Sequence, residues 1–477
     1  MPPWKAVQTF LWLGLLLALP YASPKLARFR VLSPVAAADD DAVATEAQPE
    51  PEFGEAVEAA ETQERPELAH PEPSELRTAL PLLEEDAPPR LIEDPTGTAL
   101  ASFYEALDRT ERKEPGAVTR ITHFGDSVLV TDWVTGTLRR RMQERYGDGG
   151  HGFLLIAAPW PGYFHNDVSH TASAGWAMHR VVGPLTRDGH YGLGGVSFRA
   201  NQGGIWARFG TAQKGTFGRR ASRFTVAYLA QPRGGEFEIR VDGELVDTVS
   251  TASEDVRSAI HTVKVEDGEH RFELRVKRPQ VRAFGVWLER EGPGVVYDAI
   301  GILGARMRTL DENDDAHFAE QLRLRDPHLV VLQYGINETE DGPSSRLEPA
   351  MKRVLDQVRA ALPQASCLVV GAMDRADRRG GQYVSRSFIP KLVEAQRRAA
   401  FEAGCAFFDT YAAMGGEGSM GAWARKGLAG GDLAHPSSAG AEVLGTWIHR
   451  ALVHGHALHR QGQGKSASDA TAERVER

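Results

Sequence analysis

At 477 residues, with 42% hydrophobic and 25% charged residues, the chain is too long for a single hydrophobic core and has the composition of a globular protein. Its net charge of −9 is unevenly spread, because residues 36–90 carry sixteen acidic and three basic side chains. The remainder is mildly basic, which suits an anionic polymer but excludes the strongly basic signature of a nucleic-acid-binding protein. Two cysteines exclude a disulfide-rich scaffold and a cysteine-rich metal site.

The N-terminus carries one lysine followed by an apolar run over residues 6–20. A basic start followed by a short apolar segment is typical of a signal peptide or of an N-terminal membrane anchor, which we assign to residues 1–25. Both alternatives predict export to the periplasm or the cell exterior, with anchoring to the inner membrane in the second case.

Residues 26–92 are rich in Ala, Glu and Pro and nearly free of aromatic residues. Such a segment cannot bury enough apolar surface to fold, and it predicts an extended, disordered acidic linker. The linker is either a tether that holds the folded part away from a membrane or a solvated spacer without a specific role, and the second interpretation is favoured.

A buried strand followed by a tight turn is predicted around Ser127, in the segment Ile121-Thr-His-Phe-Gly-Asp-Ser-Val128. An amphipathic helix follows, and a serine between a strand end and a helix is placed where α/β folds carry their chemistry. Because a serine alone is a poor nucleophile, it requires a base and donors for an oxyanion.

Alternating strands and helices are predicted on both sides of a central segment that has a different hydrophobic pattern. They predict an α/β fold with a doubly wound parallel sheet, formed by residues 93–159 and 295–456. A polar tail at 457–477 is expected to be disordered. Residues 160–294 instead alternate apolar and polar residues with period two and contain Asp-Gly turns, which predicts an inserted β-sandwich of the jelly-roll kind. The sandwich is expected either to bind carbohydrate or to form a structural wall.

The base for Ser127 must be a histidine oriented by a third group. Five Asp-x-x-His spacings occur, so spacing alone does not identify it: Asp148/His151, Asp167/His170, Asp267/His270, Asp314/His317 and Asp432/His435. Context selects Asp432 and His435, because their loop lies between the last strand and the last helix and can reach the edge that carries Ser127.

Donors for an oxyanion are expected at the ends of neighbouring strands. Asn337 ends the most continuous apolar run of the chain, where its amide can donate, although it could instead cap a turn. Gly304, at another strand end, and Ser127 itself can offer backbone N–H groups.

These motifs, Gly125-Asp-Ser127, Gly304, Gly335-Ile-Asn337 and Asp432-x-x-His435, resemble in order the four blocks of the SGNH (GDSL-type) hydrolases. The resemblance implies a flavodoxin-like sheet, Ser127 as nucleophile, His435 as base and Asp432 as its orienting group. It also implies an oxyanion hole formed by Ser127, Gly304 and Asn337, with no cofactor or metal. The segment 411–423 and the inserted sandwich resemble the peptidoglycan O-acetylesterase subgroup, although Val128 stands where that subgroup has histidine.

The resulting hypothesis is an exported serine esterase that removes O-acyl groups, foremost O-acetyl, from an acetylated polysaccharide such as peptidoglycan. The alternatives are a polysaccharide O-acetyltransferase on the same scaffold and a glycan-binding protein without catalysis. No nucleic-acid partner is expected.

Cys367 and Cys405 begin two successive predicted strands that are expected to pair. A disulfide is geometrically feasible in an oxidising compartment, but two buried free thiols are the favoured interpretation.

Overall fold

The computed structural model describes residues 88–475, with side chains described to residue 462. The expected signal peptide or anchor at 1–25 and most of the acidic linker lie outside the described residues. None of the helices within the described region is long and apolar enough to cross a membrane.

A five-stranded parallel sheet forms the α/β part of the described chain, in the order β13-β1-β14-β15-β18. The nucleophile strand β1 pairs with β13 on one side and β14 on the other. This is the flavodoxin-like order, with its topological switch at β1, where α/β folds place their sites. The predicted fold class is therefore confirmed. The strands are β1 (Val118–Gly125), β13 (Gly294–Gly301), β14 (Leu329–Gln333), β15 (Ser366–Val370) and β18 (Ala406–Phe408).

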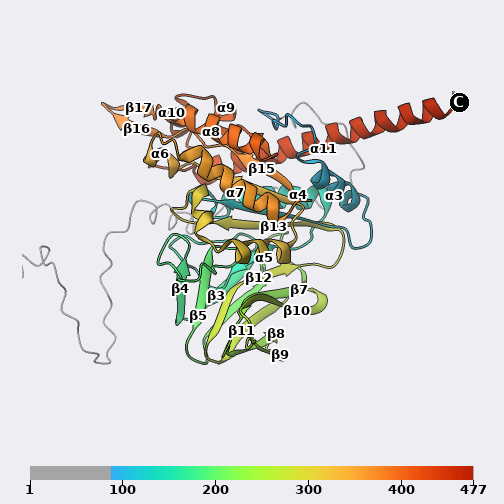
Figure 1. Cartoon of the computed structure of the whole chain (residues 1–477), viewed down its shortest axis with the longest axis vertical. Helices are drawn as coiled ribbons and strands as arrows, with labels where there is room; N and C mark the ends of the chain where they lie inside the picture. Colours follow the sequence, from blue (N-terminus) through green and yellow to red (C-terminus); the bar gives the residue numbers. More distant parts are fainter. Residues whose placement is uncertain (1–87, 476–477) are drawn as a thin grey trace, which may run out of the picture. The chain divides into compact units, whose positions relative to one another are not determined.

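Helices cover both faces of this sheet (Figure 1). On one face Ile121 of β1 belongs to a cluster with Leu138 and Leu444 of the helices. On the other face Phe124 of the same strand joins a cluster with Val354. The alternation of Ile121 and Phe124 follows from the period of two in a strand, and it requires apolar residues at both positions. The helices are α3 (Ala101–Glu111), α4 (Trp133–Tyr146), α5 (Asp315–Arg325), α6 (Glu338–Asp341), α7 (Leu347–Ala361), α8 (Ile389–Glu402), α9 (Thr410–Met414), α10 (Ser419–Arg425) and α11 (Ser438–Val475).

The inserted region forms two antiparallel sheets, which confirms the β-rich insert. Within the described residues one sheet runs β10-β7-β12-β5-β4, with β2 also paired to β12, and the other runs β3-β6-β11-β8-β9. Their strands are β2 (Gly152–Leu155), β3 (Val168–Ala172), β4 (Trp176–Arg180), β5 (Val196–Ala200), β6 (Trp206–Thr211), β7 (Ala221–Ala230), β8 (Glu236–Val241), β9 (Glu244–Ser250), β10 (Arg257–Gly268), β11 (Arg271–Arg278) and β12 (Val281–Glu289).

A buried charge cluster joins the insert to the parallel sheet. The Arg325 guanidinium of α5 donates to Asp298 on β13 (2.5 and 2.9 Å) and to Glu289 at the end of β12 (2.6 Å). Asp298 also accepts from the Thr122 hydroxyl at 2.7 Å and from the Phe153 N–H at 2.9 Å. Because one hydrophobic core also includes residues of both regions, the insert is not a separately packed domain.

Three segments differ from the sequence-based expectations. β2 precedes the expected start of the insert at residue 160 but pairs with β12, because its short apolar run fits either region. Helix α11 continues to Val475, through most of the tail expected to be disordered, since that tail has no proline and extending an existing helix needs no new nucleation. The sequence pattern does not predict the two-stranded hairpin formed by β16 (Ala376–Arg379) and β17 (Gln382–Ser385).

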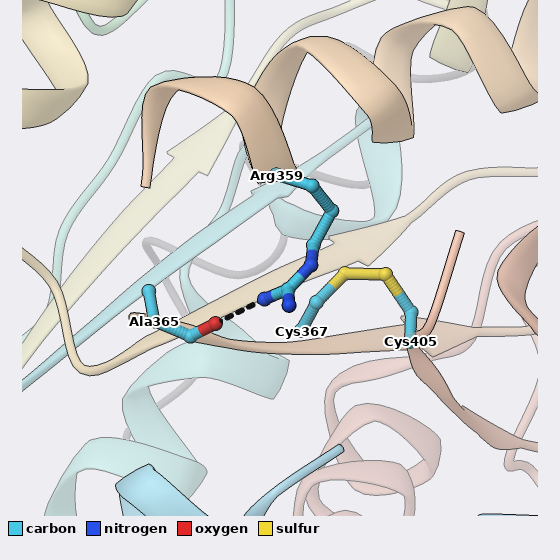
Figure 2. The surroundings of a disulfide bond; sticks show 4 residues. All are labelled: Arg359, Ala365, Cys367 and Cys405. Carbon is cyan, nitrogen blue, oxygen red and sulfur yellow. Dashed lines mark hydrogen bonds between the residues drawn. A yellow bond between two sulfur atoms is a disulfide. The ribbon is translucent and has the colours of Figure 1, made fainter. Parts of the chain in front are cut away.

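The two cysteines form a disulfide, so the favoured interpretation of two free thiols is wrong. Cys367 of β15 and Cys405, directly before β18, lie with Cα atoms 4.7 Å apart on adjacent parallel strands. Figure 2 shows Arg359 of α7 beside this bond, donating to the Ala365 carbonyl at 2.5 Å. The pairing depends on the register of two strand ends, which the sequence pattern does not fix.

Candidate active site

Ser127, His435 and Asp432 form one hydrogen-bonded chain at the C-terminal edge of the parallel sheet. Ser127 is the first residue of a short 3₁₀ turn, η3 (Ser127–Leu129), that follows β1 after Asp126. Its Oγ lies 2.6 Å from His435 Nε2, and His435 Nδ1 lies 2.5 Å from Asp432 Oδ2. The structure therefore brings together the three residues that the sequence singled out, from positions 308 residues apart.

The loop between α10 and α11 is shaped to present the histidine. Leu433 adopts a left-handed backbone conformation (φ 55°), which a leucine enters only under tertiary constraint. The tight turn lets Asp432 Oδ1 accept the N–H groups of Ala434 (3.1 Å) and His435 (3.0 Å). The carboxylate thus fixes both the backbone and the imidazole of its partner.

The charge on Asp432 is stabilised by these contacts. Burial alone would raise its pKa, but the hydrogen bond and charge of His435 and the two backbone N–H groups lower the pKa of Asp432 to about 2. An ionised Asp432 accepts a hydrogen bond from the protonated Nδ1 of His435 and leaves Nε2 with a lone pair toward the serine hydroxyl. The arrangement can remove a proton from Ser127 without any further group.

Three candidate donors for an oxyanion follow the adjacent strands β1, β13 and β14. The backbone N–H groups of Ser127 and Gly304 make no hydrogen bond to any group in the described part of the chain. Gly304 follows β13 with φ 77°, a conformation that glycine adopts without a Cβ penalty. Asn337 follows β14, and its Nδ2 donates one hydrogen to the Ala305 carbonyl at 2.8 Å, which leaves its second hydrogen available. Although Asn337 precedes α6, its side chain makes no capping hydrogen bond, so the turn-capping alternative has no support.

Asp126, which the sequence argument used only as part of a motif, joins the serine turn to the asparagine loop. Its Oδ1 accepts from the Val128 N–H at 3.1 Å, and its Oδ2 accepts from Gly335 and Ile336, both at 3.2 Å. Complete burial raises the pKa of Asp126, and these backbone donors act against that shift. Its place inside the Gly-Asp-Ser motif was the signal that could have identified it.

Glu338 links the two outer donors of the site. The Glu338 Oε1 accepts from the Met307 N–H at 2.8 Å, in the loop that follows Gly304. Burial, together with the nearby charge of Asp126, raises the pKa of Glu338 to about 7. Since Asn337 bonds to Ala305 in the same loop, two neighbouring residues hold Gly304 beside the end of β14. No sequence pattern predicts this link, because it depends on the path of the loop.

The histidines of the other four Asp-x-x-His pairs contact other groups, as expected from their positions in the sequence. His151 contacts His165 (3.2 Å), His170 the Ile156 carbonyl (3.1 Å), His270 the Asp242 carboxylate (2.7 Å) and His317 the Ser258 hydroxyl (3.2 Å). Only the Asp432 pair reaches Ser127 among the described residues.

One group of potential metal ligands exists among the described residues, and it lies apart from Ser127. It consists of Asp108, Glu111 and His456, on α3 and α11. His456 already uses both ring nitrogens, with Asp108 at 3.0 Å and the Tyr146 hydroxyl at 3.0 Å. This cluster fastens α11 to α3 and α4, and it leaves no free imidazole nitrogen for a metal.

Comparisons with known proteins agree with this geometry. Residues 268–443 match the GDSL-like Lipase/Acylhydrolase family. The matched range contains Gly304, Asn337, Asp432 and His435 but not Ser127, because the insert separates the nucleophile from the rest. A search of curated proteins finds no match.

Among solved structures, one titled "Peptidoglycan O-acetylesterase in action, 5 min" is 24% identical, covers 78% of this chain and 100% of its own, and has a TM-score of 0.63. A family two carbohydrate esterase from Cellvibrio japonicus (11% identical, 61% and 98% covered, TM-score 0.25) is more distant. So is an acetyl xylan esterase from Geobacillus stearothermophilus (16% identical, 34% and 73% covered, TM-score 0.26). Residues 268–443 therefore resemble the GDSL-like acylhydrolases, and the structure with a TM-score of 0.63 shows that the fold is shared.

Proposed function

We propose that the protein is an exported serine esterase that removes O-acetyl groups from a polysaccharide, with peptidoglycan as the first candidate. The observation that carries this proposal is the hydrogen-bonded chain Asp432–His435–Ser127, together with the N–H groups of Ser127 and Gly304 at adjacent strand ends, which make no hydrogen bond within the described residues. The fold shared with a peptidoglycan O-acetylesterase is the reason to begin with that polymer.

In the proposed reaction, Ser127 Oγ attacks the ester carbonyl while His435 Nε2 takes the hydroxyl proton. The N–H groups of Ser127 and Gly304 and the Asn337 amide donate to the oxyanion that forms. The tetrahedral intermediate then collapses, and His435 returns the proton to the departing sugar oxygen. Water, deprotonated by His435, attacks the acetyl-enzyme and releases acetate and free Ser127.

The disulfide supports the export part of the proposal. A bond between Cys367 and Cys405 persists in an oxidising compartment, whereas cytosolic thiols are kept reduced. We propose a periplasmic or extracellular location, with residues 1–25 acting as a signal peptide or as an inner-membrane anchor. A reporter that is active only in the cytoplasm, fused after Arg477, should remain inactive, and an active reporter would contradict export.

Acetate release from a panel of O-acetylated polymers tests the proposed chemistry. The panel should include acetylated peptidoglycan, acetylated xylan and an acetylated acidic polysaccharide, with the Ser127→Ala variant as the blank. We expect release that depends on Ser127. Acetyl transfer to an added oligosaccharide without net acetate would indicate a transferase, and binding without release would indicate a glycan-binding protein.

A further inference from the structure

The β16–β17 hairpin arises beside the proposed active site. The Ala376 N–H donates to the Leu433 carbonyl at 3.0 Å, within the loop that carries Asp432 and His435. The neighbouring Arg375 donates to the Ile336 carbonyl at 2.9 Å, next to Asn337. The hairpin is therefore attached both to the loop of the base and to the strand end of the amide donor.

Several contacts hold the hairpin in one position. Buried Asp374 accepts from the Ser385 hydroxyl at 2.7 Å and from the Met420 N–H of α10 at 2.8 Å. Tyr383 lies so close to α10 that a Cβ at Gly421 would be 2.8 Å from the tyrosine Cβ. In Figure 1 the hairpin projects outward beyond α10. Because the hairpin is already held in place, a ligand that binds it loses little affinity to the ordering of the hairpin.

The hairpin is basic, and one of its arginines has no acidic partner in the part of the chain that the structure describes. Residues 374–386 contain four arginines and two aspartates. Within the described residues Arg375 pairs with Glu340, and Arg379 and Arg386 pair with Asp377. Arg378 is exposed and forms no ion pair there.

Arg378 is also oriented by an aromatic ring. Its guanidinium carbon lies 5.7 Å from the centroid of the Tyr383 ring, its cross-strand partner. One helical turn beyond Gly421, Arg425 is likewise exposed and without an ion pair among the described residues. Two guanidinium groups thus remain available on a rigid support that starts at the catalytic loop.

We propose that this hairpin binds carboxylate groups of the polymer next to the acetylated sugar, through Arg378 with Arg425 as a second contact. The inference rests on the proposed polysaccharide esterase function and specifies an anionic, carboxylate-bearing polymer as substrate. A guanidinium forms two parallel hydrogen bonds to a carboxylate, and stacking on Tyr383 leaves its edge free for them. Such a contact favours acidic polymers over neutral ones.

Binding measurements on the full chain with Ser127→Ala, which cannot consume the ester, test the proposal. The probes are partially acetylated polygalacturonate, which carries carboxylates, and acetylated xylan without acidic substituents. Adding Arg378→Glu should weaken binding to the acidic polymer by about tenfold or more, while binding to the neutral polymer changes less than twofold. Arg378→Gln, which only removes the charge, should produce an intermediate loss.

Arg323→Glu is the matched control, because Arg323 is exposed and forms no ion pair in the described chain. Arg323 lies near the end of α5, which leads to the N-terminal end of β14, whereas Ser127 follows the C-terminal end of β1. Binding of the acidic polymer should therefore remain unchanged. Equal effects of Arg378→Glu and Arg323→Glu, or equal losses on both polymers, would overturn the proposal. If wild-type protein released no acetate from any polymer, the esterase proposal would fail, yet these binding measurements would still decide the role of the hairpin.

Discussion

The exposed face of the five-stranded sandwich sheet and the C-terminal edge of the parallel sheet are both rich in polar groups, but they use them differently. On the sandwich, a cavity of about 540 Å³ is lined by charged residues, most of which already have a partner, although Arg271 forms no ion pair among the described residues. Arg208 pairs with Glu273 at 2.6 Å and His270 with Asp242 at 2.7 Å. At the edge of the parallel sheet, the N–H groups of Ser127 and Gly304 have no partner within the described residues.

The comparison distinguishes polar groups that already have a partner from polar groups that can still bind a substrate. Paired surface charges contribute little to stability and have no capacity left for a developing charge. Ser127 is buried, and a buried donor without a partner costs free energy in the resting protein, so a fold retains it where something else will accept its hydrogen bond; Gly304 is exposed and does not incur that cost. We therefore place the chemistry at the sheet edge and none in the sandwich cavity.

Removal of the nucleophile gives the largest expected effect. Ser127→Ala should lower kcat by roughly 10⁴-fold or more, because the remaining groups can only activate water and stabilise its oxyanion. Labelling by a serine-directed phosphonate should be lost as well. Ser169→Ala in the sandwich cavity is the comparison and should retain wild-type kcat. A similar loss in both variants would contradict the distinction between the two regions.

The second-largest expected effect is on stability, and it concerns the buried charge cluster around Arg325 that joins the insert to the parallel sheet. Arg325→Met leaves the Asp298 side chain, which is 0% exposed, without its guanidinium partner, whereas Glu289 keeps its ion pairs with Arg120 and Arg223. The loss should lower the free energy of unfolding by about 3–5 kcal/mol in a urea titration. Arg323→Met, on the same helix but exposed and without an ion pair in the described chain, should stay within about 0.5 kcal/mol of wild type. An Arg325→Met protein as stable as wild type would show that the joint contributes nothing.

Asn337→Ala should act on kcat rather than on KM. A donor to the oxyanion is used mainly in the transition state, so we expect kcat to fall roughly 10²–10³-fold, about 3–4 kcal/mol. Because Asn337 also donates a hydrogen bond to the Ala305 carbonyl, a matched control is required. Asn313 provides it, since its side-chain amide donates to the Leu310 carbonyl at 2.8 Å. Asn313→Ala should lower the melting temperature while leaving kcat unchanged. A stable Asn337→Ala protein with normal kcat would end the oxyanion assignment.

The sequence predicted the parallel sheet and the grouping of Ser127, Asn337 and His435, because each follows or precedes a strongly patterned element. In contrast, the β16–β17 hairpin contains Arg378-Arg-Gly-Gly, without the apolar alternation that marks a half-buried strand. Its position depends on contacts with α10 and the catalytic loop, which are long-range. The same holds for the link from Glu338 to Met307 and for the disulfide, both of which depend on loop path and strand register.

The smallest effect concerns Asp432 and compares the same site at two pH values. Its folded pKa of about 2 lies below the ordinary value of about 3.9, so ionised Asp432 stabilises the folded state. This stabilisation is complete above about pH 5, where the carboxyl is ionised in both states, and it disappears as the pH falls through 2.

The difference in unfolding free energy between wild type and Asp432→Asn should therefore be largest near neutral pH and shrink toward pH 2. About a third of the Asp432 side chain is exposed, and solvent screening reduces the expected difference to about 1–2 kcal/mol. Urea titrations of both proteins at pH 6 and pH 3 measure it. A difference that stays constant, or grows as the pH falls, would mean that the hydrogen bonds to His435 and Ala434 do not favour the ionised carboxylate.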